Sequence, residues 1–238
     1  MKRIALITLL LASVIFINAK INWKDCEKEK GSIVKQEIKI DRFDKIQLLG
    51  SHKVYLTTGK AQKVTIETTQ NIIDLLKKDV ENGTWKISFE KCINTKNEIV
   101  FYVDVDQIQE LAVIGSGDII GKNKIETEEL TLNVKGSGDI KLNVGVSKLH
   151  AKIQGSGDIE LTGETSFQSI LVQGSGDYEA NHLTSQEAEA NVNGSGDIEI
   201  NVTQKITANV NGSGDILYSG NPSEVVKKVN GSGDIKAQ

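Results

Sequence analysis

The tetrapeptide Gly-Ser-Gly-Asp recurs at a nearly constant interval in the second half of this 238-residue chain. It begins at Gly115, Gly136, Gly155, Gly174, Gly194, Gly212 and Gly231. The intervals between successive starts are 21, 19, 19, 20, 18 and 19 residues. A near-constant period of this size is typical of a repeat architecture, in which each repeat is one supersecondary unit stacked on its neighbours.

Apolar and polar residues alternate on both sides of each motif. In the third repeat, Leu149, Ala151 and Ile153 precede the motif, and Ile159 and Leu161 follow it. A period of two is typical of a strand with one buried face, whereas a helix would need apolar residues three and four positions apart. We therefore predict an all-β fold, a parallel β-helix or β-solenoid with about 19 residues per coil. A variable stretch, such as residues 143–148, is expected to absorb the differences in period.

The alternation continues through the motif itself. If Val134 points inward, then Gly136 and Gly138 point inward as well, and Asp139 points outward. The motif is therefore predicted to be a tight corner, where a β-carbon would collide with the facing wall and glycine avoids the collision. The residues predicted to build these structural corners are Gly115, Gly117, Asp118, Gly136, Gly138, Asp139, Gly155, Gly157, Asp158, Gly174, Gly176, Asp177, Gly194, Gly196, Asp197, Gly212, Gly214, Asp215, Gly231, Gly233 and Asp234.

The chain divides into three predicted parts. Residues 1–19 have the pattern of a secretory signal peptide, with Lys2 and Arg3 before an apolar run at 4–17. Residues 20–113 are predicted to be an irregular N-terminal β region that continues or caps the solenoid, with a separate small β domain as the alternative. Residues 114–238 form the regular solenoid.

Local patterns add detail to the N-terminal region. Gly50-Ser51-His52-Lys53 resembles a degenerate copy of the corner. Residues 71–76 are the one short helical candidate, and Asn71 is expected to cap it.

Charge and cysteine content limit the functional classes. Without Lys2 and Arg3, 26 of the 28 basic residues remain against 32 acidic ones, which gives a net charge of −6 and disfavours nucleic acid as a partner. No apolar segment long enough to span a membrane follows the signal peptide. Cys26 and Cys92 are predicted to form a disulfide in an exported protein, and two unpaired buried thiols are the alternative.

Several of these segments together carry a resemblance to a known family. The signal peptide, residues 54–59, the Glu81-Asn82-Gly83-Thr84 turn and the Gly-Ser-Gly-Asp-Ile array resemble the bacterial head GIN domain family, described as auto-transporter adhesins. The resemblance covers residues 35–235. It implies an exported β-helical protein with a surface or adhesive role.

The column of outward aspartates is the clearest chemical candidate. A calcium-binding ladder is one interpretation, but each coil offers one Asp and one Ser, whereas calcium prefers six to eight oxygen ligands. The alternative is that each Asp hydrogen-bonds the backbone of its corner, as Asp does in turns. We favour the structural interpretation and predict no metal site and no cofactor.

An enzyme active site is not apparent. Glycosidases need two differently tuned carboxylates across a cleft, whereas the repeat offers near-equivalent ones. His52, His150 and His182 occupy unrelated places in the pattern, so no pairing of base and nucleophile is visible.

The remaining class is a binding module. Solenoids present long regular faces, and the expected partner is an unknown surface protein or glycan. Few aromatic residues could contact a ligand: Trp23, Trp85, Tyr102, Tyr178 and Tyr218. Tyr178 and Tyr218 lie in inward register, so we expect them in the core rather than at a ligand. Self-association through the C-terminal coil is also expected, because that coil would present an open β edge.

We therefore predict an exported, non-catalytic β-helical adhesin or interaction module in the periplasm, on the outer surface or secreted. The alternatives are a polysaccharide-binding or polysaccharide-active β-helix protein and a calcium-stabilised structural solenoid.

Overall fold

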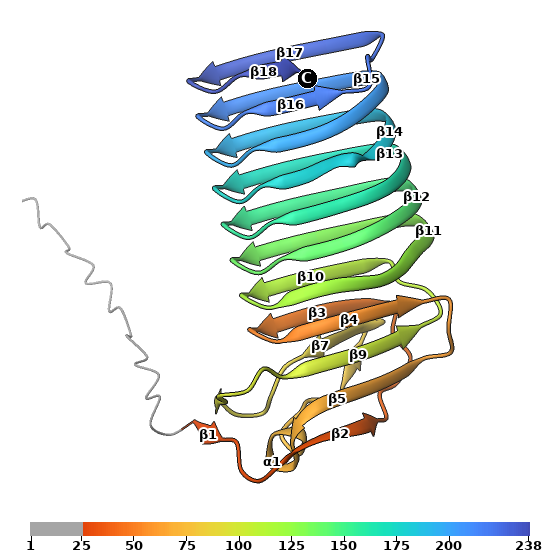
Figure 1. Cartoon of the computed structure of the whole chain (residues 1–238), viewed down its shortest axis with the longest axis vertical. Coiled ribbons are helices and arrows are strands. Elements are labelled where there is room, and N and C mark those ends of the chain that lie inside the picture. The colour runs from red at the N-terminus through yellow and green to blue at the C-terminus, as the bar shows by residue number, and fades with distance from the viewer. Residues whose placement is uncertain (1–25) are drawn as a thin grey trace, which may run out of the picture.

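The computed structural model describes residues 26–238, and its strands stack into a tall ladder of coils (Figure 1). The coils form a β-solenoid of about 7 turns, roughly 19 residues apart, as the repeat predicts. One sheet of 16 strands runs through the whole stack. The predicted signal peptide at residues 1–19 and Trp23 lie outside the described residues.

The elements differ in length between the two halves of the chain. Before the first exact motif they are β1 (Glu27–Lys28), β2 (Ile33–Ile38), β3 (Lys45–Gly50), β4 (Lys53–Thr58), β5 (Lys63–Thr69), α1 (Gln70–Ile73), β6 (Val80–Glu81), β7 (Thr84–Ile87), β8 (Ile93–Asn94), β9 (Val100–Val105) and β10 (Glu110–Gly115). The repeat region comprises β11 (Asp118–Gly136), β12 (Ile140–Gly155), β13 (Ile159–Gly174), β14 (Tyr178–Gly194), β15 (Ile198–Gly212), β16 (Ile216–Ser219), β17 (Glu224–Gly231) and β18 (Ile235–Ala237).

Each long strand from β11 to β15 begins at one corner and ends at the next, bending at the opposite edge of the stack (Figure 1). Each strand therefore supplies the second half of one coil and the first half of the following coil. Segments that precede a corner, such as residues 130–136, form one face, here called the pre-corner face. Segments that follow a corner, such as residues 140–146, form the post-corner face. Pairing between coils is parallel and in register, so that Gly136 opposes Gly155 and Gly155 opposes Gly174.

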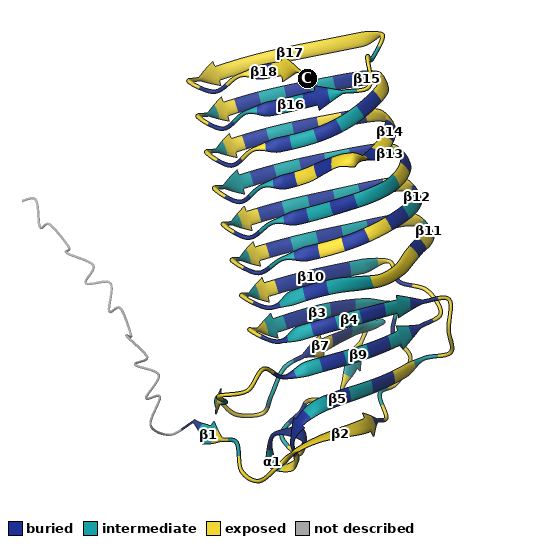
Figure 2. Cartoon of the chain, in the orientation of Figure 1, coloured by how far each residue is buried: buried dark blue, intermediate teal, exposed yellow. Residues whose placement is uncertain are grey.

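Burial alternates along both faces (Figure 2). In the third repeat Leu149, Ala151, Ile153, Ile159 and Leu161 are all buried, as the alternation predicts. Because equivalent residues of successive coils stack on one another, the core is a continuous column of aliphatic side chains, whose burial favours folding. Tyr178 and Tyr218 also point inward and are buried, in agreement with their register.

The differences in period are absorbed after the post-corner segments. The register shifts between Ile120 and Lys124 in β11, between Glu160 and Thr162 where β13 meets β14, and within 180–187 of β14. These positions lie at the start of the bend that the sequence marks as variable. The corners themselves stay in register throughout.

The N-terminal strands extend the same stack. Gly50 opposes Gly115 and Lys53 opposes Asp118, so Gly50-Ser51-His52-Lys53 is a further corner below the seven exact ones. After this coil the chain runs down through β5, β7 and β9, and β10 then returns to pair with β3. Below β4 the pairing changes, because β9 is parallel to β4 but β5 is antiparallel to β9, and β2 is antiparallel to β5.

The beginning of the described chain is tied to this lower end. Cys26 and Cys92 form a disulfide with their Cα atoms 4.7 Å apart, and the N–H of Glu27 donates to the carbonyl of Cys92 over 2.9 Å. The bond joins residues 66 positions apart in sequence, so it restricts a long loop of the unfolded chain. Within residues 26–238, no helix is long and apolar enough to cross a membrane.

The expectation that Asn71 caps the short helix is wrong. Helix α1 begins at Gln70, and Thr69, at the end of β5, occupies the N-cap position. The amide of Asn71 is used elsewhere, since it donates to the carbonyl of Lys28 over 2.8 Å and accepts from the N–H of Lys30 over 3.0 Å. Asn71 therefore holds the N-terminal segment rather than the helix end.

Candidate functional site

The glycines of the corners are required by contact between coils. The second glycine of each motif is buried, and a β-carbon built on Gly157 would lie 2.1 Å from the carbonyl oxygen of Gly138 in the preceding coil. The first glycines also have positive φ, as at Gly155 with φ of 140°, a conformation that glycine adopts without steric cost. The predicted reason for these glycines is wrong in one respect: the obstacle is the backbone of the neighbouring coil, not a facing wall.

The corner aspartates form a ladder along the stack. The Oδ1 atom of Asp158 accepts a hydrogen bond of 2.8 Å from the N–H of Asp177, the aspartate one coil further on. The same contact recurs from Asp139 to Asp158, from Asp177 to Asp197, from Asp197 to Asp215 and from Asp215 to Asp234, at 2.7–3.0 Å. Each of these carboxylates therefore caps an N–H of the next corner. Asp118 instead lies 3.8 Å from Nζ of Lys53.

Beside this ladder runs a second column of acidic side chains on the post-corner face. Glu160, Glu179 and Glu199 stand opposite one another in successive coils. Partial burial raises the pKa of Glu179, and the nearby carboxylates of Glu160 and Asp158 raise it further. Lys141 hydrogen-bonds Glu160 at one end of the column, which raises the pKa of Lys141. This face would repel an anionic partner.

A calcium site would need several oxygen ligands that converge on one point. Within 26–238, no group of three or more His, Cys, Asp or Glu side chains is arranged to hold a metal ion. The ladder explains why, since one oxygen of each linked aspartate already accepts a backbone N–H.

The three histidines are not brought together. His52 is buried between Phe89 and Phe101, with ring centroids 5.2 and 6.3 Å away, and burial lowers its pKa to about 4. His150 lies on the pre-corner face, 3.4 Å from a carboxylate oxygen of Glu129, and His182 lies after a corner in β14. None of these positions pairs a base with a nucleophile.

The part of the pre-corner face nearest the corners is rich in uncharged amides in the later coils. Its two outward columns nearest the corners carry side-chain amides, which we call the amide face: Gln154, Gln173, Asn191, Asn193, Asn209, Asn211 and Asn230. Neighbouring amides hydrogen-bond along the stack, from Asn209 to Asn191 over 3.0 Å and from Asn230 to Asn211 over 3.1 Å. The amide face therefore presents carbonyl acceptors and NH₂ donors at the spacing of the coils, about 4.8 Å.

The sequence interpretation missed this face, although a signal was present. The residue directly before the motif is Gln154, Gln173, Asn193, Asn211 or Asn230 in the last five repeats, which an alignment of the repeats makes visible. The column of Asn191 and Asn209 also contains the half-buried Leu171, with Lys152 and Lys228 at its ends. Glu189 and Thr207 border it.

Two half-buried tyrosines lie side by side at the other end of the molecule. Tyr55 of β4 lies beside Tyr102 of β9, with ring centroids 5.6 Å apart, because these strands pair in parallel. Lys122 covers the ring of Tyr55 at 3.7 Å and Lys35 covers that of Tyr102 at 3.4 Å. The two rings are therefore occupied by cations of the chain itself. Trp85, another aromatic candidate, is fully buried.

Comparisons with solved structures find the same fold in other bacterial proteins. A protein of Bacteroides fragilis NCTC 9343 described as a "putative adhesin" is 27% identical, with a TM-score of 0.83 over 89% of this chain and 99% of that one. A "putative lipid binding protein" of Parabacteroides distasonis ATCC 8503 is also 27% identical, with a TM-score of 0.74 over 89% and 98% of the two chains.

A third solved structure shares the fold at lower identity. It is a "putative adhesin" of Parabacteroides merdae ATCC 43184, 20% identical, with a TM-score of 0.73 over 89% of this chain and 98% of that one. Among curated proteins, none matches.

A protein-family model agrees with the structural likeness. The model described as "Putative auto-transporter adhesin, head GIN domain" matches residues 42–222, from the loop before β3 to the loop before β17. The matched segment spans most of the described coils and the exact corner motifs from Gly115 to Gly212. The chain therefore belongs to the head GIN domain family.

Proposed function

We propose that this protein is an exported, non-catalytic adhesion module that binds an extended neutral glycan along the amide face. Its membership of a family described as adhesins and the adhesin-like structural neighbours support the adhesive role. The observation that carries the choice of ligand is the column of uncharged amides directly before the motif, which repeats at coil spacing, with Asn191 and Asn209 beside it.

A glycan fits the amide face better than a protein does. Stable protein interfaces usually have aromatic or aliphatic anchors in their centres, and the amide face offers only the half-buried Leu171. Sugar hydroxyls both donate and accept hydrogen bonds, as do the carboxamides of Asn191 and Asn209. The only charges within the columns are those of Lys152 and Lys228, at the two ends of the inner column.

The geometry also favours an extended polymer. Equivalent amides such as Asn193 and Asn211 stand one coil apart, at a spacing of about 4.8 Å, which is close to the length of one sugar ring. A chain laid along the stack could therefore repeat the same contact at each coil. Weak contacts repeated along a rigid face add up when they are made by one ligand.

Export is supported by two independent features. The first 19 residues have the charge and apolar pattern of a signal peptide. The disulfide between Cys26 and Cys92 is typical of an oxidising, extracytoplasmic compartment. We place the mature chain in the periplasm, on the outer surface or outside the cell.

A polymer-binding assay tests this proposal. The mature protein is applied to an array of neutral and charged polysaccharides and of surface proteins, together with the double variant Asn191→Asp and Asn209→Asp. We expect binding to at least one neutral polysaccharide, no release of new reducing ends, and at least about tenfold weaker binding by the double variant, because the substitution removes NH₂ donors and adds charge. Asn143→Asp, on the post-corner face, is the matched control and should bind normally.

Three results would overturn parts of the proposal. Binding to proteins alone would exclude the glycan, turnover of the polysaccharide would exclude the non-catalytic role, and equal binding by the double variant would exclude the amide face.

Self-association through the C-terminal coil stays a prediction. Val225, Val226 and Val229 of β17 are exposed, and no described strand pairs with the outer edge of β17. We propose that a second copy covers this edge, because exposed apolar edges are sites of strand addition. Light scattering at tens of micromolar should detect a dimer or larger species that Val226→Lys abolishes. A monodisperse monomer would contradict this proposal.

A further inference from the structure

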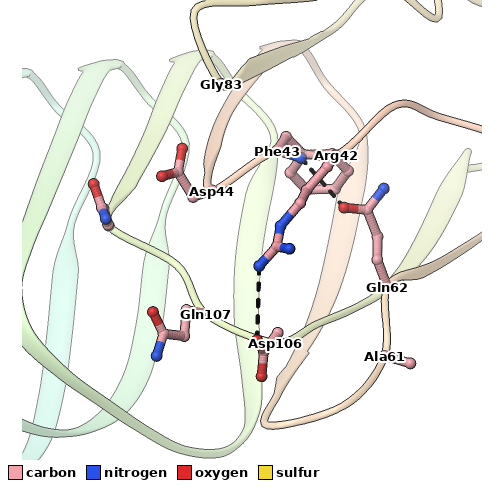
Figure 3. A pocket seen from close by; sticks show the side chains of 9 residues that line it. Arg42, Phe43, Asp44, Ala61, Gln62, Gly83, Asp106 and Gln107 are labelled. Carbon is pink, nitrogen blue, oxygen red and sulfur yellow. Dashed lines mark hydrogen bonds and ion pairs between the residues drawn. The ribbon is translucent and has the colours of Figure 1, made fainter.

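An open pocket lies in the N-terminal coils, apart from the amide face. It has a volume of about 650 Å³ and is lined by residues before β3, between β4 and β5, and between β9 and β10 (Figure 3). Its polar lining includes Arg42, Asp44, Asp106, Gln107 and Gln109. We propose that this pocket binds a single neutral sugar residue, at a site distinct from the amide face.

The pocket is held open by the backbone of its own loops. The N–H of Asp44 donates to the carbonyl of Gly83 over 3.1 Å, and the N–H of Gln109 donates to the carbonyl of Asp44 over 2.8 Å. The N–H of Gly59 donates to the carbonyl of Asp106 over 3.0 Å. These bonds connect loops far apart in sequence, so the pocket does not depend on a ligand for its shape, which is typical of small-molecule sites.

One wall of the pocket has its polar groups satisfied. Oε1 of Gln62 accepts from the N–H of Phe43 over 3.2 Å, and its Nε2 donates to the carbonyls of Ile40 and Asp41, each over 3.0 Å. The Phe43 ring is buried and packs against Trp85, with centroids 5.4 Å apart. Gln62 and Phe43 therefore fix the pocket rather than contact a ligand through unpaired groups.

The other polar groups are available to a ligand. The guanidinium of Arg42 lies 3.8 Å from a carboxylate oxygen of Asp106, which is too long for a hydrogen bond, and both side chains are largely exposed (Figure 3). Within the described chain, the side chains of Asp44 and Gln107 form no hydrogen bond either. The pocket thus combines hydrogen-bond donors from Arg42 with acceptors from the carboxylates of Asp44 and Asp106. The amide of Gln107 can both donate and accept.

The charges of the pocket largely offset one another. Arg42 offsets one of the carboxylates of Asp44 and Asp106, so the lining keeps a single net negative charge, which disfavours an anion and attracts a cation only weakly. A neutral hydroxyl group beside the Arg42–Asp106 pair can accept from the guanidinium and donate to the carboxylate at the same time. Adjacent hydroxyls on one ring could reach Asp44 and Gln107, so a neutral sugar residue matches the pocket.

Ligand-detected NMR and calorimetry test this inference on the intact mature protein. The probes are neutral monosaccharides and their methyl glycosides, with glucuronate and putrescine as charged probes. We expect saturable binding of at least one neutral sugar, and a loss of about tenfold or more in Arg42→Gln and in Asp106→Asn, since each removes a charge-assisted hydrogen bond. Lys205→Gln is the matched control, because it breaks an exposed ion pair with Glu224, 2.8 Å long, at the far end of the stack.

The inference is overturned if no neutral sugar binds, if a charged probe binds more tightly, or if binding survives both pocket variants while their melting temperatures match that of the parent protein. The amide-face double variant separates the two proposals. This variant should still bind monosaccharides in the pocket. Loss of polysaccharide binding and loss of monosaccharide binding can therefore be observed independently.

Discussion

The hydroxyl of Tyr178 donates a hydrogen bond of 2.9 Å to Oε1 of Gln168 inside the apolar core. Nε2 of Gln168 in turn donates to Oγ of Ser185 over 2.8 Å, and Oγ of Ser185 donates to the carbonyl of Asn201 over 3.0 Å. The side chains of Tyr178, Gln168 and Ser185 are almost completely buried. Burial raises the pKa of Tyr178, so its hydroxyl stays protonated and remains a donor. This polar chain links three successive coils through a core that is otherwise mostly apolar.

Removing the tyrosine hydroxyl should therefore destabilise the stack. Tyr178→Phe leaves Oε1 of Gln168 buried without a donor, which costs about 1–3 kcal/mol. Urea denaturation followed by circular dichroism measures the loss. Tyr218→Phe is the control, because within the described residues the hydroxyl of Tyr218 forms no hydrogen bond. If both variants lose the same stability, the polar chain contributes nothing specific.

A methyl group at a corner should be more damaging than one at a bend. Gly157→Ala places Cβ 2.1 Å from the carbonyl oxygen of Gly138, so neighbouring coils must separate, and we expect a loss of about 3 kcal/mol or more. Gly145→Ala meets only the end of the flexible Lys124 side chain, at 2.5 Å from Cε, and should cost far less. Thermal unfolding of the two variants gives the comparison. Similar melting temperatures would contradict the close packing of the corners.

The aspartate ladder should depend on an oxygen acceptor rather than on charge. Asp158→Asn keeps an oxygen for the N–H of Asp177 and should change stability by less than about 0.5 kcal/mol, whereas Asp158→Ala removes it and should cost about 1 kcal/mol. Chemical denaturation of both variants measures the difference.

The calcium alternative makes the opposite prediction for the same ladder. It expects the melting temperature to rise with millimolar calcium and both aspartate variants to lose that rise. We expect no calcium-dependent rise in the parent protein, and a rise that Asp158→Asn abolishes would refute the structural role.

His52 should make stability fall in mild acid. Burial lowers its pKa from 6.5 to about 4, so between these values the unfolded chain binds a proton that the folded chain does not. Stability contributed by the neutral ring is therefore complete above pH 6.5 and decreases as the pH falls towards 4, by about 3 kcal/mol in total. Denaturation midpoints across this range should show the decrease, and His52→Leu should flatten it. A slope that persists in His52→Leu would assign it to other groups.

The regular half of the fold could be predicted because one signal was repeated. Period-two alternation placed Leu149, Ile153 and Ile159 in the core, and the structure confirms their burial. The obstacle that requires Gly157 was not predictable, because it is the backbone of the coil below and depends on how closely coils approach.

In the N-terminal half, only features set by a few neighbouring residues could be predicted. The degenerate corner at Gly50 was visible, but the return of β10 onto β3 depends on contacts between residues more than 60 positions apart. Local sequence predicted that Asn71 caps a helix. In the folded chain its side-chain amide instead hydrogen-bonds the backbone of Lys28 and Lys30. The pocket around Arg42 could not be predicted from the sequence either, because loops far apart in the chain supply its lining residues.

The most direct test of glycan binding by the amide face compares a corner variant with an amide-face variant in one binding assay. Isothermal titration of the mature protein with the neutral polysaccharide identified on the array is repeated with Asp158→Asn and with Asn191→Asp combined with Asn209→Asp. The account predicts that the corner variant binds like the parent protein and that the amide-face variant binds at least about tenfold more weakly. Loss of binding in the corner variant, with normal binding by the amide-face variant, would contradict it.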